Sequence, residues 1–371
     1  MKPHVPGRWH AQGLDAQDSS GSRFSTGADV VRHLGAVQSQ LHDMALWALG
    51  RRCGRTFAEL RAEFDELSFR RTHVLRPTWH YAHLDDLPWL QQASAHRVER
   101  LAVNGLKPLG ISVDEVDRAV GAIGDVVADG RPHVRDDLRD AVVDAGLNVS
   151  GNAMAHYAMV AEVRMLIANG PMVGKQHTYL ALPRLTFSLS DDDVLTELAI
   201  RYGRGHGAFR AKDLAWWSSI TLTQARRAID LADLAHTRID GEDYALPPDA
   251  VDETPPPAAA LLSNFDEYIS YARDTTDYDG IAGTLRSAPP PSRSLRSPGT
   301  TVQDVMRSMG LLFVDGALGG LWRRTVRSPD VVVEVIPDTP LSTRAQRAVE
   351  VDAERFARFL GKHLELTVNT A

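Results

Sequence analysis

Two glutamines separated by a single residue, Gln38 and Gln40, are the side chains whose type and spacing could do chemistry. A glutamine amide accepts a hydrogen bond through its carbonyl and donates through its NH2 group, but it does not titrate near neutral pH. The pair can therefore position a water molecule without acting as a general base. Residues i and i+2 point about 200° apart in a helix but the same way in an extended segment. The two amides can meet at one water only if the preceding helix ends near Val37, and Gly35 favours such an end.

The alternative interpretation of the pair is two surface glutamines at the end of a helix. Other catalytic motifs are missing from the sequence, which has no HExxH, no paired CxxC, no GxSxG and no phosphate-binding loop. His80 and His83, three residues apart, are weak evidence for a metal. Cys53 is the only cysteine, which excludes a disulfide framework and a cysteine-rich zinc site. We expect no metal and no cofactor.

Charge and composition limit the class of protein. The chain has 371 residues, enough for two or three modules, and a net charge of −7 with a sequence pI of about 6.1. A broadly basic surface is the usual footprint of indiscriminate nucleic-acid binding, so that function is disfavoured, although local basic patches remain compatible with DNA. No apolar run is long enough to span a bilayer, and the N-terminus has no apolar signal segment. We expect a cytoplasmic monomer.

One pattern of three helices followed by a β-hairpin occurs three times along the chain. In the clearest copy, residues 190–193 match a capping box, helices follow to about residue 234, and Asp240-Gly241 marks a type I′ turn between two short strands. An earlier copy has helices over 114–127, 134–145 and 152–168 and a wing strand over 175–182. The N-terminal copy has helices from Thr26, over 44–52 and over 57–67, and strands within 72–83. Three helices and a hairpin are typical of a winged helix-turn-helix.

The C-terminal third is mixed and β-rich. Proline-rich connections at 254–257 and 288–298 precede predicted strands at 311–314, 321–326, 331–336 and 364–368 and a helix over 344–360. The sequence therefore predicts an α+β fold with three tandem winged helix-turn-helix units, a β-rich C-terminal region and a concave DNA-binding shape. The predicted domains are residues 1–110 (first winged helix, with the glutamine pair), 111–185 (second), 186–250 (third) and 251–371 (linkers and β-rich domain with a DNA-contacting hairpin).

Several segments resemble the AlkZ/YcaQ family of winged-helix DNA glycosylases, in family order over most of the chain. These are residues 29–40 and 71–80, Trp216-Trp217-Ser218, residues 261–268, and 314–316 through 322–324. The resemblance implies excision of N7-alkylated purines from double-stranded DNA. For the AlkZ branch it also implies unhooking of interstrand crosslinks made by alkylating antibiotics, which suits self-resistance of a producer. Gln38 and Gln40 match the Gln-x-Gln pair of that branch, and the resemblance makes them the catalytic residues. Ser39 departs from the usual aliphatic middle residue, which puts the local packing in doubt more than the chemistry.

The proposed substrate and the glutamines are chemically consistent. An N7-alkylguanine is cationic, so its glycosidic bond is already activated, and positioning of water is sufficient help. Neutral damaged bases should be poor substrates. No lysine lies near the pair in sequence, which favours simple hydrolysis over a Schiff-base mechanism.

DNA contacts are predicted at two basic patches. Trp322, Arg323, Arg324 and Arg327 follow a glycine-rich hairpin that could enter a minor groove, and the alternative is a solvated strand end. The second patch, on the first wing, contains Arg70, Arg71, His73 and Arg76. Asp266 is included as a possible site residue. A non-catalytic winged-helix transcription regulator is the competing function, because winged helices more often recognise DNA than carry out catalysis.

Overall fold

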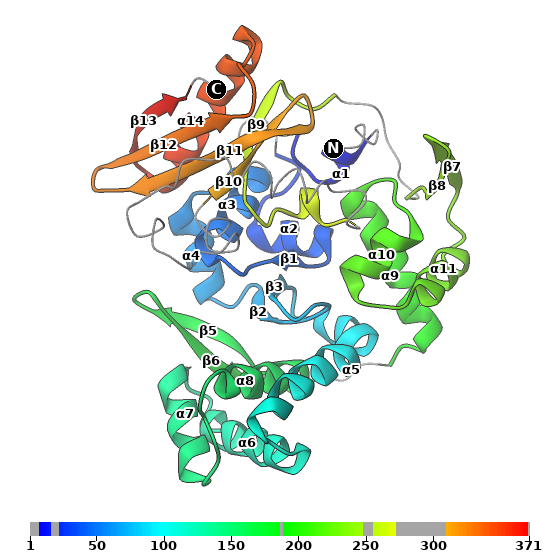
Figure 1. Ribbon diagram of the computed structural model, residues 1–371, viewed down its shortest axis with the longest axis vertical. Coiled ribbons are helices and arrows are strands. Elements are labelled where there is room, and N and C mark those ends of the chain that lie inside the picture. Colours follow the sequence, from blue (N-terminus) through cyan, green and yellow to red (C-terminus); the bar gives the residue numbers. More distant parts are fainter. Residues whose placement is uncertain (1–6, 16–21, 186–187, 248–254, 272–308, 370–371) are drawn as a thin grey trace.

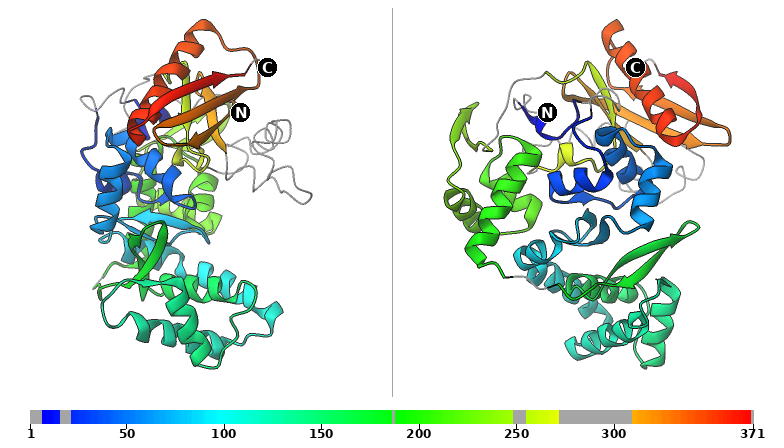
Figure 2. Two further views of the ribbon diagram at one scale, coloured as in Figure 1. Left: turned by 90° about the vertical axis from the view of Figure 1, so that its left-hand side faces the viewer. Right: turned by 180° about the vertical axis from the view of Figure 1, so that it is seen from behind.

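The elements form four groups that the ribbon diagram shows as separate regions (Figure 1). The computed structural model describes residues 7–15, 22–185, 188–247, 255–271 and 309–369. The second group lies at one end of the long axis and the C-terminal sheet at the other, and the views of Figure 2 agree on this placement. The mixed α+β class predicted from the sequence is confirmed by this architecture. Among the described residues, no helix combines the length and apolarity that crossing a membrane would take.

The N-terminal group contains the glutamine pair. Its elements are α2 (Gly27–Leu34), β1 (Val37–Gln38), α3 (His42–Cys53), α4 (Phe57–Asp65), β2 (Arg70–His73) and β3 (Trp79–Ala82). A short helix α1 (Arg8–Ala11) precedes them. The three strands form an antiparallel sheet in the order β1-β3-β2, so β1 is an edge strand. The paired residues across β1 and β3 are Val37 with Tyr81 and Gln38 with His80.

A capping box and a glycine set the two ends of α2. The Thr26 side chain accepts from the backbone N–H of Asp29, and the Asp29 carboxylate accepts from the backbone N–H of Thr26. Gly35 follows the last helical residue at φ +78°, a conformation that side chains with a Cβ rarely adopt. The chain then turns into β1. The prediction that the first helix ends close to Val37 is confirmed, and the end lies at Leu34.

The second group follows a 20-residue helix, α5 (Leu87–Leu106), and a 3-10 turn, η1 (Lys107–Leu109). Its elements are α6 (Val113–Val127), β4 (His133–Val134), α7 (Arg135–Asp144), α8 (Ala153–Val163), β5 (Ile167–Val173) and β6 (Gln176–Ala181). The predicted third helix over 152–168 is wrong at its end, because the chain reverses at Met165 (φ +58°) and Ile167 begins a strand. The helix α5 was not among the predicted elements.

The third group matches its sequence pattern closely. It contains α9 (Asp191–His206), α10 (Ala211–Ser218), α11 (Leu222–Leu231), β7 (His236–Ile239) and β8 (Glu242–Ala245). Ser190 with Asp193 and Thr221 with Gln224 form the capping boxes of α9 and α11. Asp240 and Gly241 both have positive φ, as the predicted type I′ turn requires.

The C-terminal sheet has five strands in the order β13-β12-β11-β10-β9. They are β9 (Ala259–Leu262), β10 (Met309–Val314), β11 (Ala317–Val326), β12 (Asp330–Pro337) and β13 (His363–Val368), with the helix α14 (Thr343–Leu360) packed on the sheet. A 3-10 turn, η2 (Glu267–Ile269), follows β9. The predicted strands and helix occur, and β9 was not predicted. The proline-rich stretch at 288–298 lies outside the described residues.

The hydrophobic cores cross the borders between groups. Trp47 of α3 packs against Phe356 of α14 at 5.1 Å between ring centroids, and its indole N–H donates to the Leu261 carbonyl of β9 at 3.0 Å. The first half of α5 packs with α9 to α11, whereas Ala102 and Leu106 belong to the core of the second group. Burial shared in this way couples the groups mechanically, since no group keeps its whole core when its neighbour moves.

Close approach of α9 to the end of α2 gives a stability prediction. A Cβ at Gly205 would lie 3.0 Å from both the His33 carbonyl oxygen and the Leu34 Cα, which are backbone atoms just before the glutamine pair. We expect Gly205→Ala to lower the free energy of unfolding by about 1–3 kcal/mol, measured by urea denaturation.

Gly121→Ala in α6 is the matched control for this prediction. A Cβ there meets nothing within 4 Å, so the substitution should instead stabilise the protein by about 1 kcal/mol through helix propensity. Equal effects at the two glycines would show that the contact between α2 and α9 is not tight.

Candidate active site

The strand β1 ends at Gln38 and the chain bends at Gln40, and backbone hydrogen bonds hold Gln38 and Ser39 in place. The N–H of Ser39 donates to the Trp79 carbonyl at 2.7 Å, which continues the pairing of β1 with β3. The Ser39 carbonyl accepts from Nε of Arg71 at 3.0 Å. On the other side of the strand, the N–H of Gln38 donates to Oε1 of Glu267 at 2.8 Å. Ser39, between the two glutamines, is fully buried.

Both glutamines are half-buried, and the Oε1 atom of Gln40 is buried without a hydrogen-bond partner among the described residues. The hydroxyls of Ser39, Thr72 and Thr78 are also buried and unpaired within the described part of the chain. An unsatisfied buried polar group costs about 1–3 kcal/mol. Several of them around one short strand indicate a segment selected for something other than stability.

Glu267 is the buried carboxylate at this site, with no exposed surface. Besides Gln38, it accepts from the indole N–H of Trp217 at 3.1 Å and from Nε2 of His206 at 3.4 Å, and Nη2 of Arg76 lies 3.8 Å away. Burial alone raises the pKa of Glu267, but the hydrogen bond from His206 and the positive charge of Arg76 outweigh it and hold the pKa at about 2. The carboxylate is therefore ionised, and it is sealed from solvent.

His80, opposite Gln38 on β3, is neutral. Its Nδ1 hydrogen-bonds to the Thr78 carbonyl at 2.8 Å, and its Nε2 lies 2.9 Å from Nη2 of Arg76, which can only donate. Burial and the nearby Arg76 lower the pKa of His80 to about 3. The guanidinium of Arg76 in turn lies over the ring of Trp216 at 4.8 Å, and Trp216 is partly exposed.

Of the predicted first-wing patch, most side chains face inward. Arg71 is buried, with its Nη1 donating to the Asn169 side chain at 2.6 Å and its guanidinium over the Trp79 ring. His73 is buried and hydrogen-bonded through Nδ1 to the buried Glu162. Direct DNA contact by Arg71 and His73 was a wrong prediction, because both side chains bind the neighbouring second group. Arg76 is almost fully enclosed, and Arg70 is half-buried, donating to the Leu67 carbonyl at 3.0 Å.

The β11 residues divide in a similar way. Trp322 is fully buried, its indole N–H donates to the Leu262 carbonyl at 2.9 Å, and DNA contact by its side chain was a wrong prediction. Arg323 pairs with Glu334 on β12. Arg324 is half-buried, and burial lowers its pKa while the charge of Asp43 at the start of α3 opposes that shift. Arg327 is exposed at the turn between β11 and β12. The structure thus brings Arg324 close to the segment that follows Gln40.

Asp266 is buried and binds an interior arginine, and its role as a site residue stays a prediction. Both of its carboxylate oxygens bind the buried guanidinium of Arg52, at 2.7 and 3.0 Å, and one also accepts from the Tyr268 N–H that begins η2. The neighbouring Glu267, which contacts the motif, was missed. Two adjacent carboxylates in one segment look alike in sequence, and no periodicity distinguishes the one that reaches Gln38.

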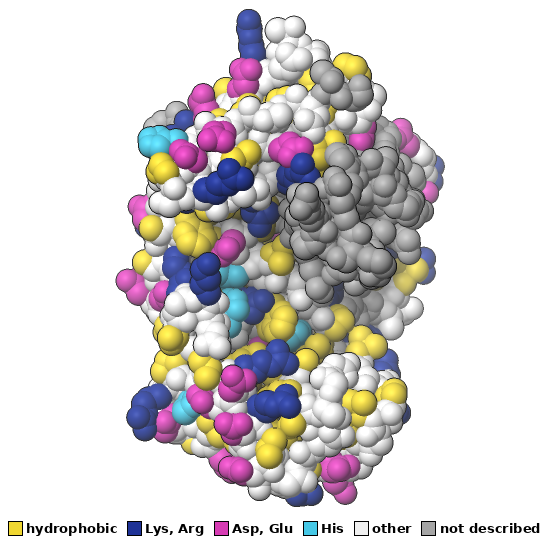
Figure 3. Space-filling model, turned by 60° about the vertical axis from the view of Figure 1, so that its left-hand side comes forward, with side chains coloured by type: hydrophobic (Ala, Val, Ile, Leu, Met, Phe, Trp, Pro, Cys, Tyr) yellow, Lys and Arg dark blue, Asp and Glu magenta, His cyan; other side chains and the backbone are white. Residues whose placement is uncertain are grey.

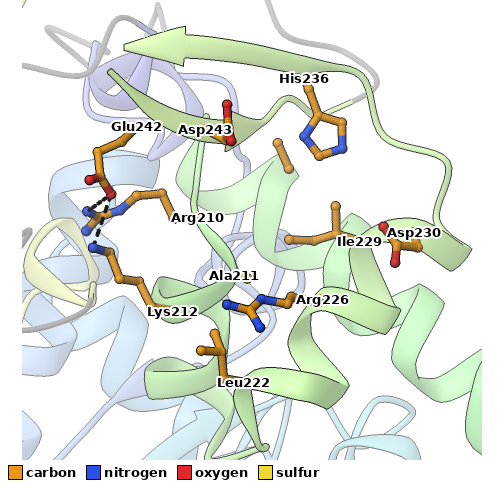
Figure 4. Close-up of a pocket in the computed structure, with 11 residues that line it drawn as sticks. Arg210, Ala211, Lys212, Leu222, Arg226, Ile229, Asp230, His236, Glu242 and Asp243 are labelled. Carbon is orange, nitrogen blue, oxygen red and sulfur yellow. Dashed lines mark hydrogen bonds and ion pairs between the residues drawn. The ribbon is translucent and has the colours of Figure 1, made fainter. Parts of the chain in front are cut away.

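On the face shown in Figure 3, histidine and basic side chains lie together at mid-height, between the upper and lower parts of the molecule. A separate pocket of about 400 Å³ lies in the third group between α10, α11 and the hairpin of β7 and β8 (Figure 4). Its cations Arg210 and Lys212 both pair with Glu242, and neither glutamine lines it. No cluster of three or more metal-ligating side chains occurs among the described residues.

Comparison with known proteins assigns the chain to the DNA glycosylases. The family described as DNA glycosylase AlkZ-like matches residues 31–359, and the chain belongs to this family. It is therefore a DNA-repair enzyme that hydrolyses N-glycosidic bonds in DNA. The fold is similar to that of the Streptomyces sahachiroi DNA glycosylase AlkZ, with a TM-score of 0.72 and 18% identity over 98% of this chain and 97% of that one. No curated protein sequence matches the chain.

Buried neutral histidines give a prediction for the dependence of stability on pH. Burial is the main cause that lowers the pKa to about 4 in His33, about 3 in His80 and His177, and about 2 in His42. The unfolded chain binds these protons at about pH 6.5 and the folded chain does not, so stability is complete above pH 6.5 and is lost as the pH falls from there toward 3.

We expect the urea midpoint to fall continuously between pH 7 and pH 4. A midpoint that stays constant over this range would show that these rings take up protons in the folded protein at the same pH as in the unfolded chain.

Proposed function

We propose that this protein is a monofunctional DNA glycosylase that hydrolyses the N-glycosidic bond of N7-alkylated purines, including bulky or interstrand-crosslinked adducts of an alkylating antibiotic. The observation that carries the proposal is the end of α2 at Leu34, after which the chain enters the edge strand β1 at the motif, so that the amides of Gln38 and Gln40 are free to converge on one water. The carboxylate that contacts this segment, Glu267, is buried and occupied by other donors. Amides that position water suit a reaction whose leaving group is already activated, and an N7-alkylated purine carries that positive charge before it is bound.

Simple hydrolysis is the mechanism that the residues favour. A Schiff-base mechanism needs an amine nucleophile, and no lysine lies near the pair in sequence. Lys212 is ion-paired to Glu242 in the third group. A crosslinked base cannot rotate freely out of the helix, so we propose that the adduct is approached in a shallow cleft from one groove rather than by complete base flipping.

For DNA binding, we propose that the N-terminal, second and third groups act as three tandem winged helix-turn-helix units, divided near residues 110, 185 and 250. Each has helices followed by a hairpin, which supports this division. Arg327 at the exposed β11–β12 turn and Arg324, which feels the charge of Asp43 on α3, are the proposed phosphate contacts of the C-terminal sheet. The neighbouring Arg323 is paired with Glu334. Arg70 is the proposed contact of the first wing.

An excision assay separates this function from that of a non-catalytic regulator. The protein is incubated with DNA that contains N7-methylguanine, and the DNA is then heated in alkali. Strand cleavage at the modified base above the no-enzyme control supports the glycosylase, and a neutral lesion such as 8-oxoguanine should be cleaved poorly. Binding to one undamaged sequence with no cleavage would support the regulator.

Removal of either amide should slow excision without weakening binding. We expect Gln38→Ala and Gln40→Ala each to lower the single-turnover rate constant on N7-methylguanine DNA by on the order of 10²-fold, because water loses a positioning partner. The Kd for damaged DNA should stay near the wild-type value. Gln346→Ala on the exposed face of α14 is the control and should excise normally. Normal excision by both motif variants and by the double variant would remove the pair from the mechanism.

The exposed Arg327 gives a prediction for DNA affinity. Loss of one phosphate contact should reduce the slope of log K against log salt concentration by about 0.9, so Arg327→Ala should weaken binding most at low salt. The rate constant at saturating enzyme should be unchanged. Arg358→Ala removes another exposed charge, which pairs with Glu354 on α14, and serves as the control. If both variants show the wild-type slope, the β11–β12 turn does not contact DNA.

A further inference from the structure

β1 is an edge strand whose outer side is left open by the sheet. Along an extended strand, successive N–H groups point to opposite sides, and that of Ser39 points toward β3. The N–H of Gln38 therefore points away from the sheet, on the side where no described strand pairs with β1. The acceptor that meets it is Oε1 of Glu267, 229 residues later in the chain.

Glu267 joins the segments that surround the motif. Its donors come from β1, from α9 through His206 and from α10 through Trp217, with Arg76 of the β2–β3 loop at 3.8 Å. The carbonyl of Glu267 also accepts from the Gln12 side chain at 3.3 Å. Each partner fixes the carboxylate in place, so the position of the Gln38 backbone is set by three regions that are remote in sequence.

Only a carboxylate satisfies these neighbours. An ionised carboxylate accepts at both oxygens, whereas a glutamine side chain has one accepting oxygen and an NH2 group that donates. A glutamine at position 267 would face the N–H of Gln38 or that of Trp217 with a second donor. It would also leave the enclosed Arg76 without its counter-charge.

Glu267 does not itself take a proton from water. Its side chain has no exposed surface, and its oxygens are occupied by the donors described above. A carboxylate in this position acts on the reaction through the backbone that it holds.

We propose that Glu267 is a positioning residue for glycosidic-bond hydrolysis, which holds the Gln38 backbone so that the two amides are directed at the same water. This inference rests on the proposed function. In this inference a single ionised side chain sets the geometry of the motif. Glu267 therefore affects the rate of the chemical step and not the affinity for DNA.

The first test compares Glu267→Gln with the wild type in single-turnover excision of N7-methylguanine. We expect the rate constant to fall on the order of 10²-fold, as displacement of a catalytic group by about 1 Å can cause, with the Kd for damaged DNA unchanged. Selective ¹⁵N labelling of glutamine should show the Gln38 amide proton shifted upfield in the variant, because its acceptor has lost its charge. A wild-type rate in the folded variant would overturn the inference.

Asp352→Asn is the matched control. Asp352 is also buried, accepts a backbone N–H from Leu261 at 2.7 Å and pairs with Arg51 and Arg355, but it lies on α14. Its variant should lose stability and keep the wild-type rate constant. If Glu267→Gln does not fold, Glu267→Asp keeps the charge opposite Arg76 but is one methylene shorter. The same slow rate is then expected, and a wild-type rate would again overturn the inference.

A double-mutant cycle shows whether Glu267 acts through Gln38. In a Gln38→Ala background, Glu267→Gln should have little further effect on the rate constant, because the side chain that it positions is gone. If the double variant slows the reaction by the product of the two separate effects, the inference is overturned, whereas the proposed glycosylase function still stands. If the wild-type protein excises no alkylated purine, the proposed function fails first, and that outcome is visible before any variant is made.

Discussion

An edge strand of two residues, held from both sides, is the constraint on which the site depends. β3 supplies the acceptor for Ser39, Arg71 binds the Ser39 carbonyl, and Glu267 accepts the N–H that faces away from the sheet. A strand this short cannot be stable alone, because two residues give too few backbone hydrogen bonds to offset the conformational entropy lost when they become ordered. Its geometry is therefore imposed from outside, by side chains from distant parts of the chain.

Several arginine side chains also point into the interior, where they connect segments that are distant in sequence. Arg52 donates to the Gln12 and Ala48 carbonyls and binds Asp266 with two nitrogens, and Arg71 joins the first and second groups. A guanidinium has five N–H donors in a fixed plane, so one buried side chain can satisfy several acceptors from different segments. Arginine-rich segments that look like nucleic-acid patches in sequence are here partly the framework of the interior.

The charge states of the ionisable groups inside the site stay constant near neutral pH. Burial keeps His80 and His42 neutral, and the ionised Glu267 faces the charge of Arg76. The groups around the motif therefore keep their charges over this pH range. This arrangement is consistent with chemistry that depends on the position of neutral amides rather than on proton transfer to a titrating side chain.

Local sequence determined the elements and the motif. Capping boxes at Thr26, Ser190 and Thr221, the break at Gly35 and the turn at Asp240-Gly241 act within a few residues, so they can be predicted without the rest of the fold. Those signals are sufficient to predict that the first helix ends before Gln38, and they predict the third group almost completely.

Tertiary structure alone decided which side chains surround that segment. Trp322, Arg71, His73 and Asp266 read as exposed or functional in sequence but are buried, and Glu267 reads as the equal of Asp266 but is the residue that reaches Gln38. Burial and pairing depend on contacts between residues far apart in the chain, such as Gln38 and Glu267, which are 229 positions apart, and no local pattern encodes such a contact. The Gln-x-Gln motif can be found in the sequence, whereas the side chains that hold it in place come together only when the distant segments have packed, because their contacts are not local.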